Sequence, residues 1–147
     1  PVPLEICLLI NSNETARSEL EQHRWRLVSP QDHASTSDAY RKYILGSRGE
    51  FTVVKGGYTA GRTGWFSDRS GCYLAAGRPV IIQDTGIGKY LPTGSGLLTF
   101  TDIDNAAEAI DNVEKDYGPH AAAAASFARE YLDSDRVLSR LVSLAGI

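Results

Sequence analysis

The sequence lacks a long apolar run, since no window approaches the roughly 18 uninterrupted apolar residues of a membrane-spanning helix. Its first ten residues, PVPLEICLLI, have no basic region before the apolar stretch and no signal-peptide cleavage pattern. These absences argue against a transmembrane segment and a secretory signal. We therefore expect a soluble, cytoplasmic protein.

Cysteine and histidine are scarce, at two and three residues. Cys7 lies in an apolar run and Cys72 in an apolar helical segment, so both are expected to be buried, reduced thiols. His23, His33 and His120 are far apart in sequence, which predicts surface histidines and no metal site. No glycine cluster has the spacing of a dinucleotide fingerprint or a P-loop. We therefore expect neither a metal nor a nicotinamide or ATP cofactor.

What is present is the composition of a globular domain, with 147 residues of which 42% are hydrophobic and 22% charged. We expect residues 1–147 to form a single domain. The net charge of -3 hides a basic middle: residues 41–89 hold eight basic and three acidic residues, so they carry +5 and the remainder -8. The basic residues are widely spaced and lack interleaved aromatics, which favours a small anionic ligand over nucleic acid.

Strands and helices are predicted to alternate along the chain. Apolar runs of strand length lie at 4–10, 25–28, 51–55, 79–83 and 96–100. Helical patterns with candidate caps lie at 14–22, 39–47, 67–76, 103–113 and 120–144, the last with a break at 133–135. The candidate caps are Asn13, Ser37 or Asp38, Thr101 or Asp102, and Asp133 or Ser134. This order predicts an α/β fold: a doubly wound, mainly parallel, Rossmann-like sheet with helices on both faces.

Ligands of such sheets bind beyond the carboxyl ends of the strands, where the loops after 51–55 and 79–83 are expected. Ser67 and Asp68 stand where a helix begins, so its first amide groups and dipole favour a phosphate. Arg69 lies in the first turn, where a positive charge opposes the positive end of the helix dipole unless an anion neutralises it. Either Asp68 caps the helix and Arg69 pairs with a neighbouring carboxylate, or Arg69 binds a diphosphate in a bidentate manner.

Further polar residues flank this helix in sequence. Lys55 and Arg62 either converge on the same anion or are simply solvated. In the loop after the expected strand at 79–83, Asp84 and Thr85 are polar side chains suited to sugar hydroxyls, and Gly86 permits close backbone approach. Asp84 is equally compatible with an ordinary turn, and Trp65 is expected to be a packing aromatic rather than a base-stacking one.

The segment GWFSDRSGCYLAAGRPVIIQDTG (64–86), with LPTGSGLLTF (91–100), resembles the C-terminal, donor-binding lobe of GT-B fold glycosyltransferases. The resemblance covers roughly residues 25–147. In that family a helix faces the donor diphosphate, a small-Gly-x-Pro turn leads into an apolar strand, and the next loop lies by the nucleotide or sugar. The matching parts here are 67–76, 76–79, 80–83 and 84–88. One large branch has two glutamates where this chain has Gly64 and Cys72, so the resemblance specifies neither the ribose contacts nor the donor.

The resemblance implies a lobe of a Leloir-type enzyme that binds a nucleoside-diphosphate sugar and needs no obligatory metal. The acceptor-binding N-terminal lobe would be its partner, and 147 residues leave no room for it. The isolated domain would then be inactive, and the resemblance assigns no catalytic residue. Two alternatives remain: a non-catalytic α/β module that binds anions or a partner, and a flavodoxin-like enzyme that binds a phosphorylated cofactor.

Overall fold

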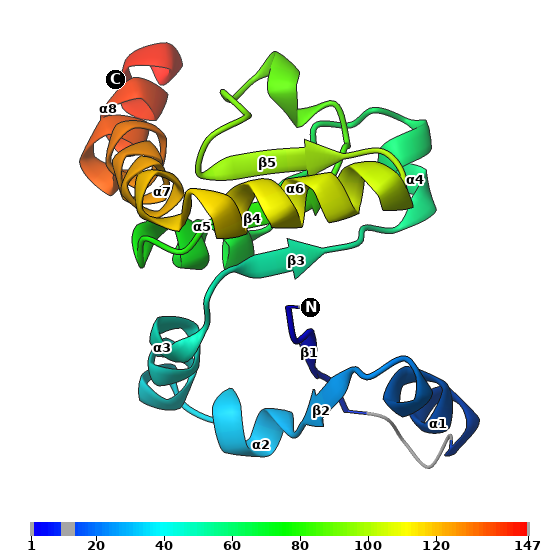
Figure 1. The fold of residues 1–147 in the computed structure, drawn as a ribbon. Helices are drawn as coiled ribbons and strands as arrows, with labels where there is room; N and C mark the ends of the chain where they lie inside the picture. Colours follow the sequence, from blue (N-terminus) through cyan, green and yellow to red (C-terminus); the bar gives the residue numbers. More distant parts are fainter. Residues whose placement is uncertain (1, 10–13, 147) are drawn as a thin grey trace. The chain divides into compact units, whose positions relative to one another are not determined.

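The structure is a computed structural model, and it describes residues 2–9 and 14–146. The chain divides into two units, Pro1–Gly46 and Ser47–Ile147. Each unit has helices beside a small sheet whose strands run parallel. The predicted α/β class with parallel strands is therefore confirmed, with the strands in two sheets (Figure 1).

The first unit is a strand–helix–strand motif followed by two helices. Strand β1 (Glu5–Cys7) pairs in parallel with β2 (Arg26–Val28), and α1 (Glu14–Gln22) joins them. Then come α2 (Pro30–His33) and α3 (Ser37–Gly46). Helix α1 has the predicted bounds, while its predicted cap, Asn13, lies outside the described residues.

Two details of this unit were not predicted. The turn-rich stretch contains the short helix α2, because Ser29 Oγ accepts a hydrogen bond from Gln31 N at 3.3 Å and proline stands at the first helical position. Helix α3 is capped by Thr36, whose Oγ1 accepts from Ala39 N at 3.1 Å, rather than by Ser37 or Asp38. Threonine caps less readily than serine or aspartate, so sequence preference pointed to the wrong residue.

The second unit is built on a three-stranded parallel sheet of order β3-β4-β5. Its strands are β3 (Glu50–Thr52), β4 (Val80–Gln83) and β5 (Leu97–Phe100). Its helices are α4 (Gly56–Ala60), α5 (Asp68–Ala75), the 3-10 turn η1 (Ile87–Lys89), α6 (Ile103–Lys115), α7 (Tyr117–Tyr131) and α8 (Ser134–Ala145). In register, Glu50 lies opposite Val80, and Val80 opposite Leu97.

Side-chain alternation gives this sheet two buried faces. On one face, which α6 covers, Ile81, Leu98 and Phe100 pack with Ala106, Ala109 and Val113 (Figure 1). Phe51 stacks on Phe100 there, with ring centroids 5.1 Å apart. The opposite face carries Val80, Ile82 and Leu97, all fully buried, on the side of α5 and α7. The sheet is thus covered on both sides, as a continuous apolar strand such as β4 predicts.

The predicted turn at Gly77 is confirmed, with a left-handed φ of 66°. A second such glycine, Gly96 (φ 73°), lies against α7, where a Cβ would be 2.5 Å from Ala124 N. His120 Nδ1 accepts a hydrogen bond from Gly96 N at 3.3 Å, and the histidine is 6% exposed. The expectation of a surface His120 was therefore wrong, because the close approach of the turn to α7 covers the ring.

The expected burial of the cysteines was wrong for Cys72, which is exposed, while Cys7 is half-buried. Helix α5 buries Ser70, Tyr73 and Leu74, spaced three and four residues apart, so position 72 lies on the outer face. In α6 the same spacing buries Ala106, Ala109 and Val113 and leaves Ile103, the first residue of the helix, 85% exposed.

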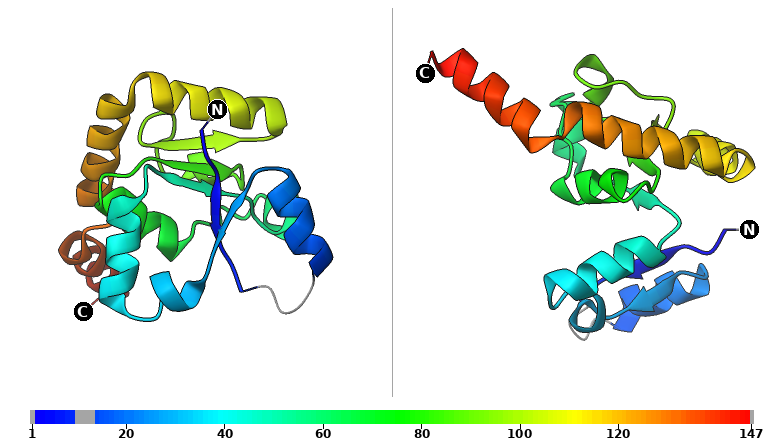
Figure 2. Two further views of the ribbon diagram at one scale, coloured as in Figure 1. Left: turned by 60° about the horizontal axis from the view of Figure 1, so that its bottom comes forward. Right: turned by 90° about the vertical axis from the view of Figure 1, so that its left-hand side faces the viewer.

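The C-terminal helix α8 extends beyond the end of α7 (Figure 2, right). Asp133 Oδ1 caps it by accepting from Arg136 N at 3.1 Å, as predicted. The helix is amphipathic but buries none of its residues. Its large apolar side chains are all at least 46% exposed: Val137, Leu138, Leu141, Val142 and Leu144. Among the described residues, no helix is long and apolar enough to cross a membrane.

Candidate functional site

The predicted binding residues follow β3 and β4, at the carboxyl edge of the second unit's sheet. Two hydrogen bonds join the segment after β3 to the end of β4 and the loop beyond it. Val54 N donates to Gln83 Oε1 at 3.2 Å, and Gly64 N donates to Thr85 O at 2.8 Å. The two loops therefore form one connected surface, placed where parallel sheets bind ligands.

Arg62 and Asp84 link these loops through an ion pair, with Arg62 Nη2 3.3 Å from Asp84 Oδ2. The arginine side chain is 56% exposed and the carboxylate 20%. Asp84 Oδ1 also accepts from Gly86 N at 2.8 Å, so the residue makes a turn and an ion pair at once. Gly86 has a φ of 84°, and a Cβ there would lie 3.1 Å from Arg62 O. The backbones approach so closely that only glycine fits without strain.

Thr85 is fully buried between the two loops. Its Oγ1 donates a hydrogen bond to Trp65 O at 2.8 Å, while its carbonyl accepts from Gly64 N. Gly86, beside it, is buried as well. Thr85 and Gly86 therefore hold the loops together from inside, and the exposed polar groups of this surface are on their neighbours.

Helix α5 begins where Ser67 and Asp68 predicted a helix start, but its cap is Ser67 rather than Asp68. Ser67 is 5% exposed, and its Oγ accepts from Arg69 N at 3.2 Å. Asp68 Oδ1 accepts from the same amide at 2.8 Å and is exposed to solvent. Ser67 is therefore the cap, and the positive end of the helix dipole lies at this edge of the sheet because α5 runs back from it.

The Arg69 side chain reaches β3. Its Nε donates to Glu50 Oε1 at 2.5 Å and its Nη2 to Thr52 Oγ1 at 3.2 Å. Thr52 Oγ1 in turn donates to Glu50 Oε1 at 2.7 Å. The carboxylate is 5% exposed, whereas the Arg69 side chain is 47% exposed. A buried carboxylate on the strand thus holds an arginine whose side chain is half-exposed.

Glu50 and Thr52 were missing from the sequence-based site. Glu50 is one of the three acidic residues of the basic middle, and it stands one residue before the expected strand at 51–55, so the strand pattern did not include it. The available signal was the alternation of β3, in which residues 50 and 52 share one face while Phe51 points into the core. A carboxylate on that face needs a cation, and the crossover helix offers Arg69 in its first turn.

Lys55 stands apart from the other predicted residues. It occupies the N-cap position of α4, where it makes no side-chain capping bond, and it is exposed. In the described part of the chain, no hydrogen bond or ion pair joins its side chain to another predicted site residue. Its interpretation as a solvated lysine is the one that this geometry favours.

Aromatic rings border the loops. Trp65 stacks on Tyr58 with centroids 5.0 Å apart and planes within 7°, so it is a packing aromatic. Tyr90 is 69% exposed. Its ring lies over Gly64, where a Cβ would be 2.5 Å from Tyr90 Cε2. Gly64 also has a left-handed φ of 72°, so both its conformation and its neighbour require glycine.

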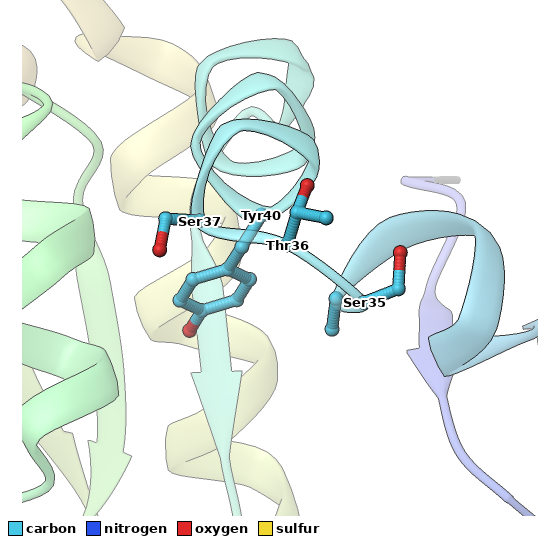
Figure 3. A pocket seen from close by; sticks show the side chains of 5 residues that line it. Ser35, Thr36, Ser37 and Tyr40 are labelled. Carbon is cyan, nitrogen blue, oxygen red and sulfur yellow. The ribbon is translucent and has the colours of Figure 1, made fainter.

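A pocket of about 500 Å³ lies elsewhere, at the start of α3 (Figure 3). Its lining consists of Ala34, Ser35, Thr36, Ser37 and Tyr40. All five belong to the first unit, so none of the predicted binding residues contributes to it. Thr36 Oγ1 is engaged in capping α3.

Metal ligands do not gather at the loops. Across residues 2–9 and 14–146, no group of three or more His, Cys, Asp and Glu side chains is arranged to hold a metal ion. The loops and the start of α5 offer two arginine side chains that are each about half-exposed, a helix N-terminus and the partly exposed Asp84 carboxylate. Groups of this kind bind anions and hydroxyls. Comparisons with protein-family models, curated proteins and solved structures gave no match for this chain.

Proposed function

We propose that this chain is the donor-binding lobe of a glycosyltransferase and binds a nucleoside-diphosphate sugar at the loops after β3 and β4. One observation carries the proposal. The loops that hold Arg62 and Asp84 are bonded to each other at the carboxyl edge of a parallel sheet, beside the N-terminus of α5. Nucleotide ligands of open parallel sheets bind at this edge.

The diphosphate would lie at the start of α5. Amide groups of the first turn and the dipole stabilise negative charge there, and Arg69 adds a cation that is 47% exposed. As the bond to the sugar breaks, charge grows on the departing nucleoside diphosphate. Fixed donors aimed at that charge lower the barrier to transfer.

The Asp84–Gly86 loop would serve the sugar or the nucleoside. The Asp84 carboxylate is 20% exposed and its position is fixed by Gly86 N and by Arg62. A carboxylate held in this way accepts hydrogen bonds from hydroxyl groups. Transfer to an acceptor would need the N-terminal lobe, so we expect binding, without turnover, from this chain.

Pairing of both arginines with carboxylates does not prevent anion binding. The Arg69 side chain bonds Glu50 and Thr52 and is still 47% exposed, so an anion can approach it from solvent. The N-terminus of α5 adds attraction for an anion, and the exposed Asp68 carboxylate in the same turn opposes it in part. The bound anion would share the arginines with Glu50 and Asp84, which predicts weak affinity.

Calorimetric titration with UDP, GDP and dTDP tests the proposal. At least one of them should bind, and Arg69→Ala and Arg62→Ala should each weaken that binding by about tenfold, the loss expected for a charge-assisted contact. Arg140→Ala is the matched control, because it removes the same charge from α8, which has no buried residue. Absence of binding by all three nucleotides, also with an N-terminal lobe restored, would refute the proposal.

A further inference from the structure

The buried carboxylate of Glu50 has one ionic partner in the described structure, Arg69. Burial of a carboxylate costs several kcal/mol unless a cation and hydrogen bonds compensate it. Here the compensation is uneven. Glu50 Oε1 receives two hydrogen bonds, whereas Oε2 is buried and receives none from the described residues. The Glu50 carboxylate therefore depends on Arg69 and Thr52 for its compensation.

Arg69 gains little for its own helix from this arrangement. A cation in the first turn of a helix opposes the dipole, so the residue is placed at an electrostatic cost to α5. Its Nε and Nη2 are fixed by a strand instead, and nearly half of the side chain remains exposed. The strand thus orients a guanidinium that the helix alone would not keep in place.

We propose that Glu50, assisted by Thr52, is a positioning residue that holds the Arg69 guanidinium in the orientation in which it binds the diphosphate of a nucleotide. This inference rests on the proposed function. The physical reason is preorganisation: a long arginine side chain loses rotamer entropy when it binds an anion, and a partner that fixes it beforehand removes that cost at binding. Glu50 itself does not touch the nucleotide.

Simple electrostatics makes the opposite prediction. Glu50→Ala removes a negative charge beside Arg69, so Coulomb attraction alone would strengthen nucleotide binding. Positioning requires that Glu50→Ala weakens it, because Arg69 loses its fixed partner. The sign of the change in affinity therefore separates the two effects.

The experiment is calorimetric titration of the full chain with whichever of UDP, GDP and dTDP binds the unmodified protein. Glu50→Ala should weaken binding by about tenfold, and Glu50→Gln, which keeps an oxygen for Arg69 Nε and Thr52, should recover most of that loss. Thr52→Val changes no charge and removes one guanidinium contact, so it should weaken binding by about threefold, and Thr52→Ser should restore it. Melting curves establish that each variant is folded. If Glu50→Ala does not fold, Thr52→Val and Thr52→Ser carry the test of positioning.

A double-mutant cycle completes the test. In an Arg69→Ala background, Glu50→Ala should cause no further loss of affinity, since the residue acts through the arginine. Three results would each overturn the inference while nucleotide binding itself stands. They are equal or tighter binding by Glu50→Ala, no effect of Thr52→Val, and an undiminished effect of Glu50→Ala in the Arg69→Ala background. Absence of binding by the unmodified chain would instead overturn the proposed function, and the inference with it.

Discussion

Thr85 is the residue through which the candidate site can be perturbed most cleanly. Valine has nearly the same shape as threonine, so Thr85→Val keeps the packing of a fully buried side chain and deletes its hydroxyl. The change removes the 2.8 Å hydrogen bond to Trp65 O and leaves that carbonyl without its donor. An acceptor orphaned in this way costs about 1–3 kcal/mol.

We expect Thr85→Val to destabilise the chain by about 2 kcal/mol, which is roughly a 10 °C lower Tm for a unit of about 100 residues. Urea unfolding followed by tryptophan fluorescence measures the loss. Hydrogen exchange at Gly64 N, which donates to Thr85 O, reports whether the loops separate. Thr85→Ser keeps the hydroxyl and should retain the protection of that amide. A Thr85→Val protein within about 0.5 kcal/mol of the parent, with Gly64 still protected, would refute the role of this bond in joining the loops.

Three further predictions concern other parts of the fold. Gly96→Ala should destabilise the fold by about 2–5 kcal/mol in urea unfolding, because the new side chain adds left-handed strain and collides with the α7 backbone. Gly94→Ala is the control: its φ is 108° but the space around it is open, so it should cost about 1–2 kcal/mol. Equal losses for the two variants would contradict this geometry. Asp102→Ala should cost about 1 kcal/mol, because its Oδ1 caps α6, and an unchanged Tm would contradict that role. Burial raises the pKa of the Cys7 thiol, and the Glu5 carboxylate raises it further, so less thiolate forms at a given pH. Glu5→Gln should therefore lower this pKa and speed the alkylation of Cys7 at pH 8, which mass spectrometry measures. An unchanged alkylation rate would exclude the effect of Glu5.

Strong local patterns made most elements predictable. The run PVIIQ could only be a buried strand, and Gly77 with Pro79 fixed the end of the helix before it, because glycine accepts a left-handed turn and proline cannot continue a helix. Helix α1 and the caps Asp102 and Asp133 follow equally local chemistry. Short elements such as α2 and α4 lie below the length at which periodicity is readable.

The position of the candidate loops in the fold was predictable, but the contacts between their side chains were not. The carboxyl edge of a parallel sheet follows from topology, so the loops after β3 and β4 could be named in advance. Which carboxylate meets Arg69 depends on a contact across 19 positions, from strand to helix, and only the folded chain brings Glu50 there. Likewise, the burial of Thr85 and His120 results from loops packing on distant segments.

The most direct test of the proposed function is calorimetric titration of this chain with UDP, GDP and dTDP, run in parallel on Arg69→Ala and Arg140→Ala. We expect that one nucleotide binds the unmodified chain, that Arg69→Ala weakens the binding by about tenfold, and that Arg140→Ala leaves it unchanged. Equal weakening by both variants would reduce the effect to net charge. No binding of any of the three nucleotides, with or without an N-terminal lobe, would contradict the assignment of these loops as a donor site.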